Sequence, residues 1–333
     1  MSSLRQHAKR LRLARLLWES PDRLDFLREL SAAELAILHG ACRAALLAPH
    51  RALYQRLAHA SKLLPTALTA HIAEHTLGPL LCARISAEMS MPRTLALCQH
   101  LSPPFMAAVT LHMDMDMDMD SLADLAAALP PESLRGIARE LVARGEFITQ
   151  GELVDFLPPG ITTRIAAEIA SGEVMLRILL FIKSPARLQS LLEQLPLSEL
   201  GALARAAADD SLGLLPHTLC LLQRLTPIWQ HRLIDTALAE GEATLTKLVL
   251  ETDRLDLWGS ALPFSALLDR AAQHRLLSLP IWKNEELLAR ALHNARNPAS
   301  RPFLQALVAE LAAEALERVM ALMARQDTVA PPP

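Results

Sequence analysis

The sequence predicts an all-α protein whose middle part is a superhelical array, or solenoid, of short helix pairs joined by turns that contain proline. Two observations lead to this fold class. A leucine pair followed by a proline-containing turn recurs five times along the chain. Hydrophobic residues make up 51% of the chain but aromatic residues only 4%, so the core must consist of aliphatic side chains, which suits closely packed helices. Recurrence of one supersecondary unit is typical of repeat architectures.

Each copy of the recurring unit contains two leucines four residues apart. Residues at this spacing lie on the same side of a helix, so the pair predicts the apolar face of a helix near its end. The first leucines are Leu97, Leu125, Leu153, Leu191 and Leu221, and the second leucines are Leu101, Leu129, Leu157, Leu195 and Leu225.

A turn follows each second leucine. The residue before a proline is disfavoured in the α region, so the first helix is expected to end there. Proline then suits the first turn of the next helix, where its missing N–H costs nothing. We expect Ser102 and Thr226 to cap the helices that follow them. The turns are Ser102-Pro103-Pro104, Pro130-Pro131, Pro158-Pro159, Pro196-Leu197 and Thr226-Pro227.

An apolar residue stands eight positions after each second leucine and begins the face of the second helix. These residues are Val109, Ile137, Ile165, Leu203 and Leu233. The second leucines, continued to Leu262, are separated by 28, 28, 38, 30 and 37 residues, so insertions fall between units. Leu64-Pro65 and Leu262-Pro263 resemble degraded copies of the same unit.

Helices are also expected outside the repeats. Ser31 and Glu34 form a capping-box pattern, which predicts a helix that runs to Leu47 before Pro49. A further helix is expected over residues 51–60, and another from Pro65 to Leu77. The predicted organisation is an N-terminal helical region (1–90), a repeat array (91–260), a C-terminal helical cap (261–326) and a disordered tail (327–333).

Composition and charge narrow the classes of function. The formal net charge is −3, which gives no general attraction to nucleic acid. Only 11 glycines are present, which argues against a glycine-rich phosphate loop, and no cofactor is predicted. The basic residues of the N-terminus are expected to form the solvated face of an amphipathic helix, with a membrane-surface helix as the alternative. They are Arg5, Lys9, Arg10, Arg12 and Arg15.

The four cysteines are isolated and do not have the spacing of a metal site. They predict buried small apolar residues in a reducing compartment, and therefore a cytoplasmic location. No secretory signal pattern and no transmembrane segment are expected. The cysteines are Cys42, Cys82, Cys98 and Cys220.

One short motif has the spacing of a metal site. His71, Glu74 and His75 match the H-x-x-E-H pattern of one class of zinc peptidases, in which the two histidines bind the metal and the glutamate acts as base. No third ligand is evident in the sequence. The alternative is a pair of semi-buried, hydrogen-bonded histidines beside an apolar stripe.

A Met-Asp repeat runs from Met113 to Asp120 and offers a second candidate metal site. In an extended loop, the carboxylates of Asp114, Asp116, Asp118 and Asp120 would point the same way and could hold a hard cation. The simpler interpretation is a short duplication inserted between two repeat helices.

The units over 122–142 and 151–170 resemble the cytosolic N domain of MgtE-type magnesium channels, which has similar Leu-Pro-Pro-Glu turns. The resemblance covers residues 92–240 and implies a right-handed superhelix of short helices that contacts other proteins or helices. No channel domain accompanies it, and no magnesium ligand is transferred from it.

Three functions remain open from the sequence. The first is a non-enzymatic scaffold or adaptor that binds a protein partner, or a second copy of itself, on the repeat surface. The second is a carrier of an apolar small molecule, such as a lipid or isoprenoid, with Met91, Met106, Met113 and Met175 as an adaptable lining. The third is a metal-dependent enzyme that uses His71, Glu74 and His75. No catalytic motif supports an enzyme otherwise.

Overall fold

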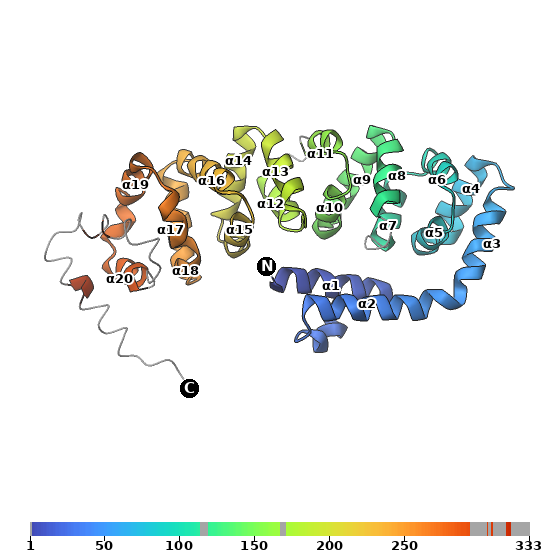
Figure 1. Ribbon diagram of the computed structural model, residues 1–333, viewed down its shortest axis with the longest axis horizontal. Helices are drawn as coiled ribbons and strands as arrows, with labels where there is room; N and C mark the ends of the chain where they lie inside the picture. The colour runs from blue at the N-terminus through green and yellow to red at the C-terminus, as the bar shows by residue number, and fades with distance from the viewer. Residues whose placement is uncertain are drawn as a thin grey trace. The chain divides into compact units, whose positions relative to one another are not determined.

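The protein is all-helical, as the sequence predicts (Figure 1). The computed structural model describes residues 2–113, 119–166 and 171–293, together with 305, 308 and 318–320. Within these residues the chain forms helices, turns and bends and contains no strand. The backbone groups of the described core therefore form their hydrogen bonds within helices. The helices can pack on one another only through the side chains on their faces.

The chain divides into two compact units. Unit 1 comprises Met1–Ile169 and Phe181–Leu191, and unit 2 comprises Ala170–Leu180 and Leu192–Pro333. The boundary between the units falls inside the range 91–260, which the sequence predicts to be one array.

The elements of unit 1 are α1 (Ser2–Leu17), η1 (Pro21–Leu27), α2 (Ala32–Leu47), η2 (Ala48–His50), α3 (Arg51–Ser61), α4 (Thr66–Ile72), η3 (Ala73–Leu77), α5 (Gly78–Ser86), α6 (Met91–Cys98), α7 (Pro103–His112), α8 (Met119–Ala128), α9 (Pro131–Ala143), α10 (Phe147–Val154) and α11 (Pro159–Ala166).

Unit 2 is built from a similar succession of short helices, and α13 (Pro185–Gln194) spans the boundary between the units. The elements of unit 2 are α12 (Gly172–Leu179), α14 (Leu197–Ala207), α15 (Leu215–Leu222), α16 (Pro227–Ala239), α17 (Glu242–Arg254), α18 (Trp258–Ala261), η4 (Leu262–Leu267), α19 (Arg270–Leu277), η5 (Pro280–Lys283) and α20 (Glu285–His293).

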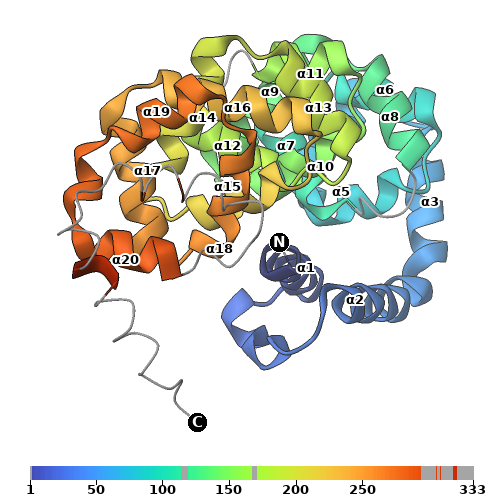
Figure 2. The ribbon, with the colours of Figure 1, turned by 60° about the vertical axis from the view of Figure 1, so that its left-hand side comes forward.

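Helices that are next but one in the sequence pack against each other within each unit (Figure 2). In unit 1, α5 packs on α7, α7 on α9 and α9 on α11, while α4 packs on α6 and α6 on α8. In unit 2, α12 packs on α14, α14 on α16 and α15 on α17.

All five predicted turns lie between helices, so this part of the prediction is confirmed. Each proline segment separates two helices, as at Pro130 between α8 and α9 and at Pro158 between α10 and α11. Seven of the ten repeated leucines are buried and the other three are half-buried. Leu129 and Leu157, from two different copies of the unit, belong to one hydrophobic cluster, which shows that the repeated faces pack on one another.

The predicted helix caps are confirmed at two of three positions. Ser31 and Glu34 form the full capping box, with the Ser31 N–H donating to Glu34 Oε2 at 2.7 Å and the Glu34 N–H donating to Ser31 Oγ at 3.3 Å. The Ser102 hydroxyl accepts from the Phe105 N–H at 3.4 Å. Thr226 occupies the N-cap position of α16, but its side chain makes no capping hydrogen bond.

One continuous helical stretch, Ala32–Ser61, is long and apolar enough to cross a membrane by length and composition alone. Only 6% of its most apolar window is buried, and it lies near the N-terminus, where signal sequences have similar properties. The sequence predicts no stretch of this length, and it predicts that the helix after Ser31 runs to Leu47, before Pro49. In the structure, Pro49 lies in the short turn η2, where its missing N–H is tolerated, and the helical path continues into α3.

Candidate functional site

The H-x-x-E-H motif lies at the end of α4 and in η3, a π-helical turn. The rings of His71 and His75 stack with their centroids 4.2 Å apart, and both residues are exposed. His75 Nδ1 lies 3.0 Å from the His71 carbonyl oxygen. The two histidines are therefore adjacent, as the motif predicts, on an exposed helix face.

The Glu74 carboxylate does not join the two histidines as a third metal-binding group. Its carboxylate accepts a hydrogen bond from the Ser102 hydroxyl, and its Oε2 atom lies 3.4 Å from the Ser102 backbone nitrogen. Across the part of the chain that the structure describes, no group of three or more His, Cys, Asp or Glu residues could hold a metal ion. The structure thus offers no observation that favours a metal-dependent enzyme.

The structure describes only the two ends of the Met-Asp repeat. Asp114, Asp116 and Asp118 lie outside the described residues, and Asp120 lies in the first turn of α8, where its side chain is not described. The second candidate metal site therefore stays a prediction from the sequence.

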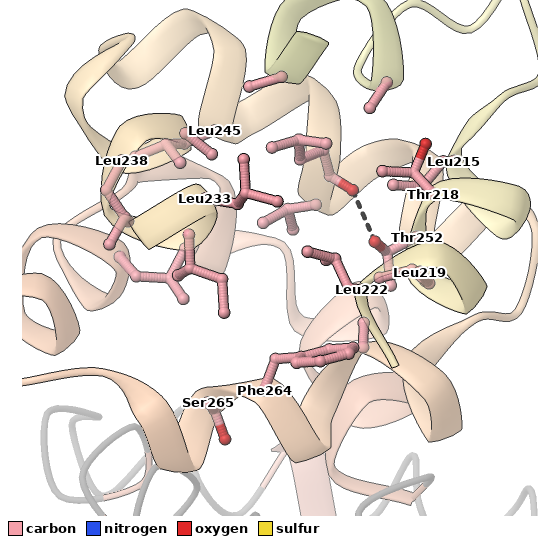
Figure 3. Close-up of a pocket in the computed structure, with 18 of the residues that line it drawn as sticks. Leu215, Thr218, Leu219, Leu222, Leu233, Leu238, Leu245, Thr252, Phe264 and Ser265 are labelled. Atoms are coloured by element: carbon pink, nitrogen blue, oxygen red, sulfur yellow. Dashed lines mark hydrogen bonds between the residues drawn. The ribbon is translucent and has the colours of Figure 1, made fainter. Parts of the chain in front are cut away.

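Unit 2 contains an apolar cavity between its helices, called here the unit 2 cavity (Figure 3). Its volume is about 230 Å³, and α14, α15, α16 and α17 contribute most of its walls, with Phe264 and Trp258 among the other lining residues. Most of the side chains labelled in Figure 3 lie around one space and come from several helices, whereas the Ser265 hydroxyl points away from it. Representative lining residues are Leu215, Leu219, Leu222, Leu233, Leu238 and Leu245.

The few polar groups of the unit 2 cavity already have hydrogen-bond acceptors. The Thr218 hydroxyl donates to the Leu214 carbonyl at 2.9 Å, and the Thr252 hydroxyl donates to the Leu248 carbonyl at 2.7 Å (dashed line in Figure 3). The Ser265 hydroxyl donates to the Leu262 carbonyl at 2.6 Å. Because the hydrogens of these three hydroxyls point to backbone carbonyls, none of the hydroxyls is left to donate a hydrogen bond to a ligand in the cavity.

Unit 1 contains a second apolar cavity of about 270 Å³, called here the unit 1 cavity. Helices α3 to α9 line it. Its hydroxyl groups also donate to backbone carbonyls: the Thr110 hydroxyl, for example, donates to the Met106 carbonyl at 2.8 Å. Burial raises the pKa of the Cys82 and Cys98 thiols, which line this cavity, to about 11. The sequence predicts buried cysteines, but all four are only half-buried, and Cys82 and Cys98 are wall residues of this cavity.

A third site differs in chemistry from both cavities. A small pocket of about 40 Å³ in unit 1, called here the arginine pocket, has four arginines from three helices among its lining residues. Arg12 and Arg15 come from α1, Arg43 from α2 and Arg84 from α5. Its other lining residues are Leu16, His39, Thr110, Leu111, His112, Met113, Thr149 and Glu152.

The arginine pocket overturns one prediction from the sequence. The basic residues of the first helix were expected to form a solvated face, but the Arg12 side chain is only 14% exposed and forms an ion pair with the buried Glu152. Arg15 forms an ion pair with Glu146 and lies 3.4 Å from the Thr149 hydroxyl. The reason is tertiary, because α10 places two carboxylates against α1, a contact that spacing along the chain cannot reveal.

The methionines proposed as a ligand lining are divided by the structure. Met106 and Met113 line the unit 1 cavity, whereas Met91 and Met175 line neither of the two apolar cavities. The excess of aliphatic residues is evident in the sequence, but the positions of the cavities are not, because cavities form where the faces of helices far apart in the chain leave space between them.

Comparison of the chain with protein-family models, with curated proteins and with solved structures finds no match.

Proposed function

We propose that this protein is a non-enzymatic binding protein that carries an apolar small molecule in the cavities between its helices. The observation that carries this proposal is the unit 2 cavity, which has a volume of about 230 Å³ and walls made almost entirely of aliphatic and aromatic carbon. An apolar cavity of ~150 Å³ is already large enough to take up benzene in another protein. Because its hydroxyls donate to backbone carbonyls, the cavity favours a hydrocarbon chain or ring over a ligand that needs hydrogen-bond donors.

The hydrophobic effect supports the same proposal. Apolar wall that faces water is unfavourable by roughly 25 cal/mol per Å² of apolar surface. An apolar ligand that fills the space covers this surface, adds van der Waals contacts and stabilises the folded state by its binding free energy.

The scaffold for these cavities is, we propose, a superhelical array of helix pairs. Three features support it: the packing of helices next but one in the sequence, the proline turns between paired helices, and the shared cluster of repeated leucines. Stacked pairs leave space between their two layers wherever the facing side chains are small, as Ala204 and Ala237 are in unit 2.

The test is saturable binding of a neutral apolar fluorophore, N-phenyl-1-naphthylamine, to the purified full-length chain. We expect up to two sites per chain, one for each apolar cavity. Ala237→Leu, which fills part of the unit 2 cavity, should remove one site. Ala239→Leu on the same helix is the matched control, because Ala239 is exposed and does not line that cavity. Absence of saturable binding to the wild-type chain would reject the carrier function.

A second candidate function, a scaffold or adaptor that binds a protein partner, is favoured by a different observation. The α2–η2–α3 stretch exposes large apolar side chains, with Ile37 at 73% and Leu46 and Leu53 at 46% each. Leu46 and Leu53 are seven residues apart and fall on a similar side of the stretch, whereas Ile37, nine residues before Leu46 in α2, lies on the opposite side of that helix. Large apolar side chains that stay exposed on helices can mark interaction sites. Sedimentation velocity of wild type and Ile37→Ser, followed by affinity capture with both, tests it. A single monomeric species and identical captured proteins for both chains would count against the scaffold function.

A further inference from the structure

The turn between α3 and α4 holds three leucines in contact with solvent (Figure 1). Leu63 is 86% exposed, which is the largest value among the large apolar side chains of the described residues. Leu64 is 40% exposed, and Leu68, in the first turn of α4, is 46% exposed. These three residues are called here the corner leucines. Large apolar side chains gathered at one turn are typical of a surface that meets an apolar partner.

Arg93 of α6 fixes the backbone on which the corner leucines stand. Its guanidinium group donates to the Leu64 carbonyl oxygen at 3.0 Å, to Thr66 Oγ1 at 3.0 Å and to Thr69 Oγ1 at 3.1 Å. It also donates to the Ser61 carbonyl oxygen, before the turn. Because the backbone is held on both sides of the turn, the corner leucines stay exposed instead of folding onto unit 1.

The segment around the corner leucines contains no carboxylate. No aspartate or glutamate occurs between Glu34 and Glu74, although the whole chain contains 36 of them. The same segment includes most of the helical stretch Ala32–Ser61, whose most apolar window is only 6% buried. Its net charge is therefore positive and its surface is apolar. The basic residues of the segment are Arg43, Arg51, Arg56 and Lys62.

The nearest carboxylate with a contact to α3 pairs with the other end of that helix. Arg51 Nε lies 2.9 Å from Glu88 Oε1, and Gln55 Nε2 donates to Glu88 Oε2 at 3.0 Å. Lys62 directly precedes Leu63 and is exposed, as is Arg56. The long side chains of lysine and arginine can lie along an apolar phase while their charges stay at its surface.

We propose that this corner docks onto the surface of a lipid bilayer that contains anionic phospholipids. The corner leucines enter the boundary between head groups and acyl chains, and the charges of Arg56 and Lys62 lie at the phosphates. Affinity for such a surface grows with the apolar area that enters it and with each nearby cation. A nucleic acid would match the cations but would leave the leucines in water.

The unit 1 cavity reaches the same corner. Leu57, Ala60 and Ser61 of α3 line it, and Leu64 lines it while remaining 40% exposed. A carrier of an apolar molecule must exchange it with a phase that dissolves it, and docking at this corner brings a wall of the cavity to such a phase. Only this last step rests on the proposed carrier function; the docking itself does not.

The test is co-flotation of the purified full-length chain with large unilamellar vesicles. One set consists of phosphatidylcholine alone, and in the other set about one lipid in three is phosphatidylglycerol. We expect the chain to bind the anionic vesicles about tenfold or more tightly than the neutral ones, and to bind them more weakly at high salt.

Leu63→Ser should weaken binding to the anionic vesicles about tenfold, because this side chain gains most by leaving water. Leu68→Ser repeats the measurement at a second corner leucine if Leu63→Ser does not fold. Lys62→Gln should weaken binding to the anionic vesicles about fivefold and leave binding to the neutral vesicles unchanged.

Ile228→Ser is the matched control and should leave vesicle binding unchanged. Ile228 is 78% exposed in α16, but it shares a surface groove with Asp235 and Glu240, whose carboxylates disfavour an anionic surface. The control therefore separates the acid-free corner from exposed apolar side chains in general.

Absence of binding to the anionic vesicles, equal binding to both sets, or unchanged binding of the Leu63 and Leu68 variants would overturn this inference. Binding of a DNA duplex as tight as vesicle binding, and insensitive to Leu63→Ser, would assign the cations to nucleic acid instead. A dimer that Leu63→Ser dissociates, without vesicle binding, would assign the corner to a second copy of the chain. The carrier function is judged separately, by saturable fluorophore binding in solution without vesicles.

Discussion

A Cβ atom placed on Gly172 would lie only 2.4 Å from the backbone oxygen of Ala202. Gly172 is the first residue of α12, and Ala202 lies in the middle of α14. The two helices pack closely within unit 2, and the missing side chain at Gly172 is what permits their approach. The corresponding contact in unit 1 joins Gly136 of α9 and Pro103 of α7, where a Cβ atom would lie 2.8 Å from the proline Cβ.

Gly172→Ala should destabilise the protein by about 1–3 kcal/mol, because the added methyl group meets backbone that cannot move away freely. Urea unfolding followed by circular dichroism measures this. Gly40→Ala is the matched control, since nothing lies within 4 Å of its Cβ position in α2. There the substitution should stabilise by about 0.5–1 kcal/mol through helix propensity. Equal effects at both positions would contradict the close approach.

Ser31→Ala should lower the free energy of unfolding by about 1 kcal/mol, because the N-cap hydroxyl and its partner Glu34 satisfy two backbone donors of α2. Thr226→Ala provides the comparison: Thr226 is also an N-cap residue, but its side chain makes no capping bond. Its loss should change the free energy of unfolding by a few tenths of a kcal/mol at most. If Thr226→Ala proved as costly as Ser31→Ala, the assigned caps would be wrong.

Asp253→Asn should destabilise unit 2 by about 1–2 kcal/mol at neutral pH. Asp253 accepts from Arg290 at 2.8 and 2.6 Å and from the Trp258 indole N–H at 3.1 Å. Desolvation alone would raise the pKa of Asp253, but the hydrogen bonds from Arg290 and Trp258 outweigh it and the pKa lies below its ordinary value.

A carboxyl group whose pKa is lowered by folding stabilises the protein above its unfolded pKa of ~3.9, and this contribution disappears as the pH falls through the folded value. The stability difference between wild type and Asp253→Asn should therefore be present at pH 7 and shrink below pH ~4. A difference that stays constant down to acid pH would show that Asp253 acts through packing alone.

As the pH falls, the free energy of unfolding should decrease at pH values well above those at which carboxyl groups titrate. Burial is the main cause that lowers the pKa of His7, His112 and His217 below the usual value of 6.5. The unfolded chain then binds more protons than the folded chain below pH ~6.5, so the free energy of unfolding falls as the pH drops. Thermal melting between pH 7.5 and 5 measures this, and His112→Gln should flatten the dependence. A melting temperature that rises on acidification would contradict the prediction.

The helices and turns of the repeats could be predicted because they obey local rules. A leucine pair four residues apart, a proline after it and a hydroxyl at the N-cap each act within one turn of helix, as Ser31 and Ser102 show. Thr226 marks the limit of such rules, since its residue type is suitable but its side chain makes no capping bond.

The predicted metal motif shows what cannot be predicted from residues that are close in the sequence. His71 and His75 are adjacent because four residues make one helical turn, which the sequence states directly. Glu74 binds Ser102, which is 28 residues away, because α7 begins beside η3. No spacing within the motif could reveal that competing donor.

The helical backbone, the positions of the proline turns and a mostly aliphatic core could be predicted from the sequence, because each depends on composition or on neighbours within a few residues. The contact of α10 with the arginines of α1, the close approach of Gly172 to Ala202 and the apolar space between helices of each unit could not be predicted in this way. These features depend on which faces meet across tens of residues, and the shapes of the meeting side chains set the space that is left.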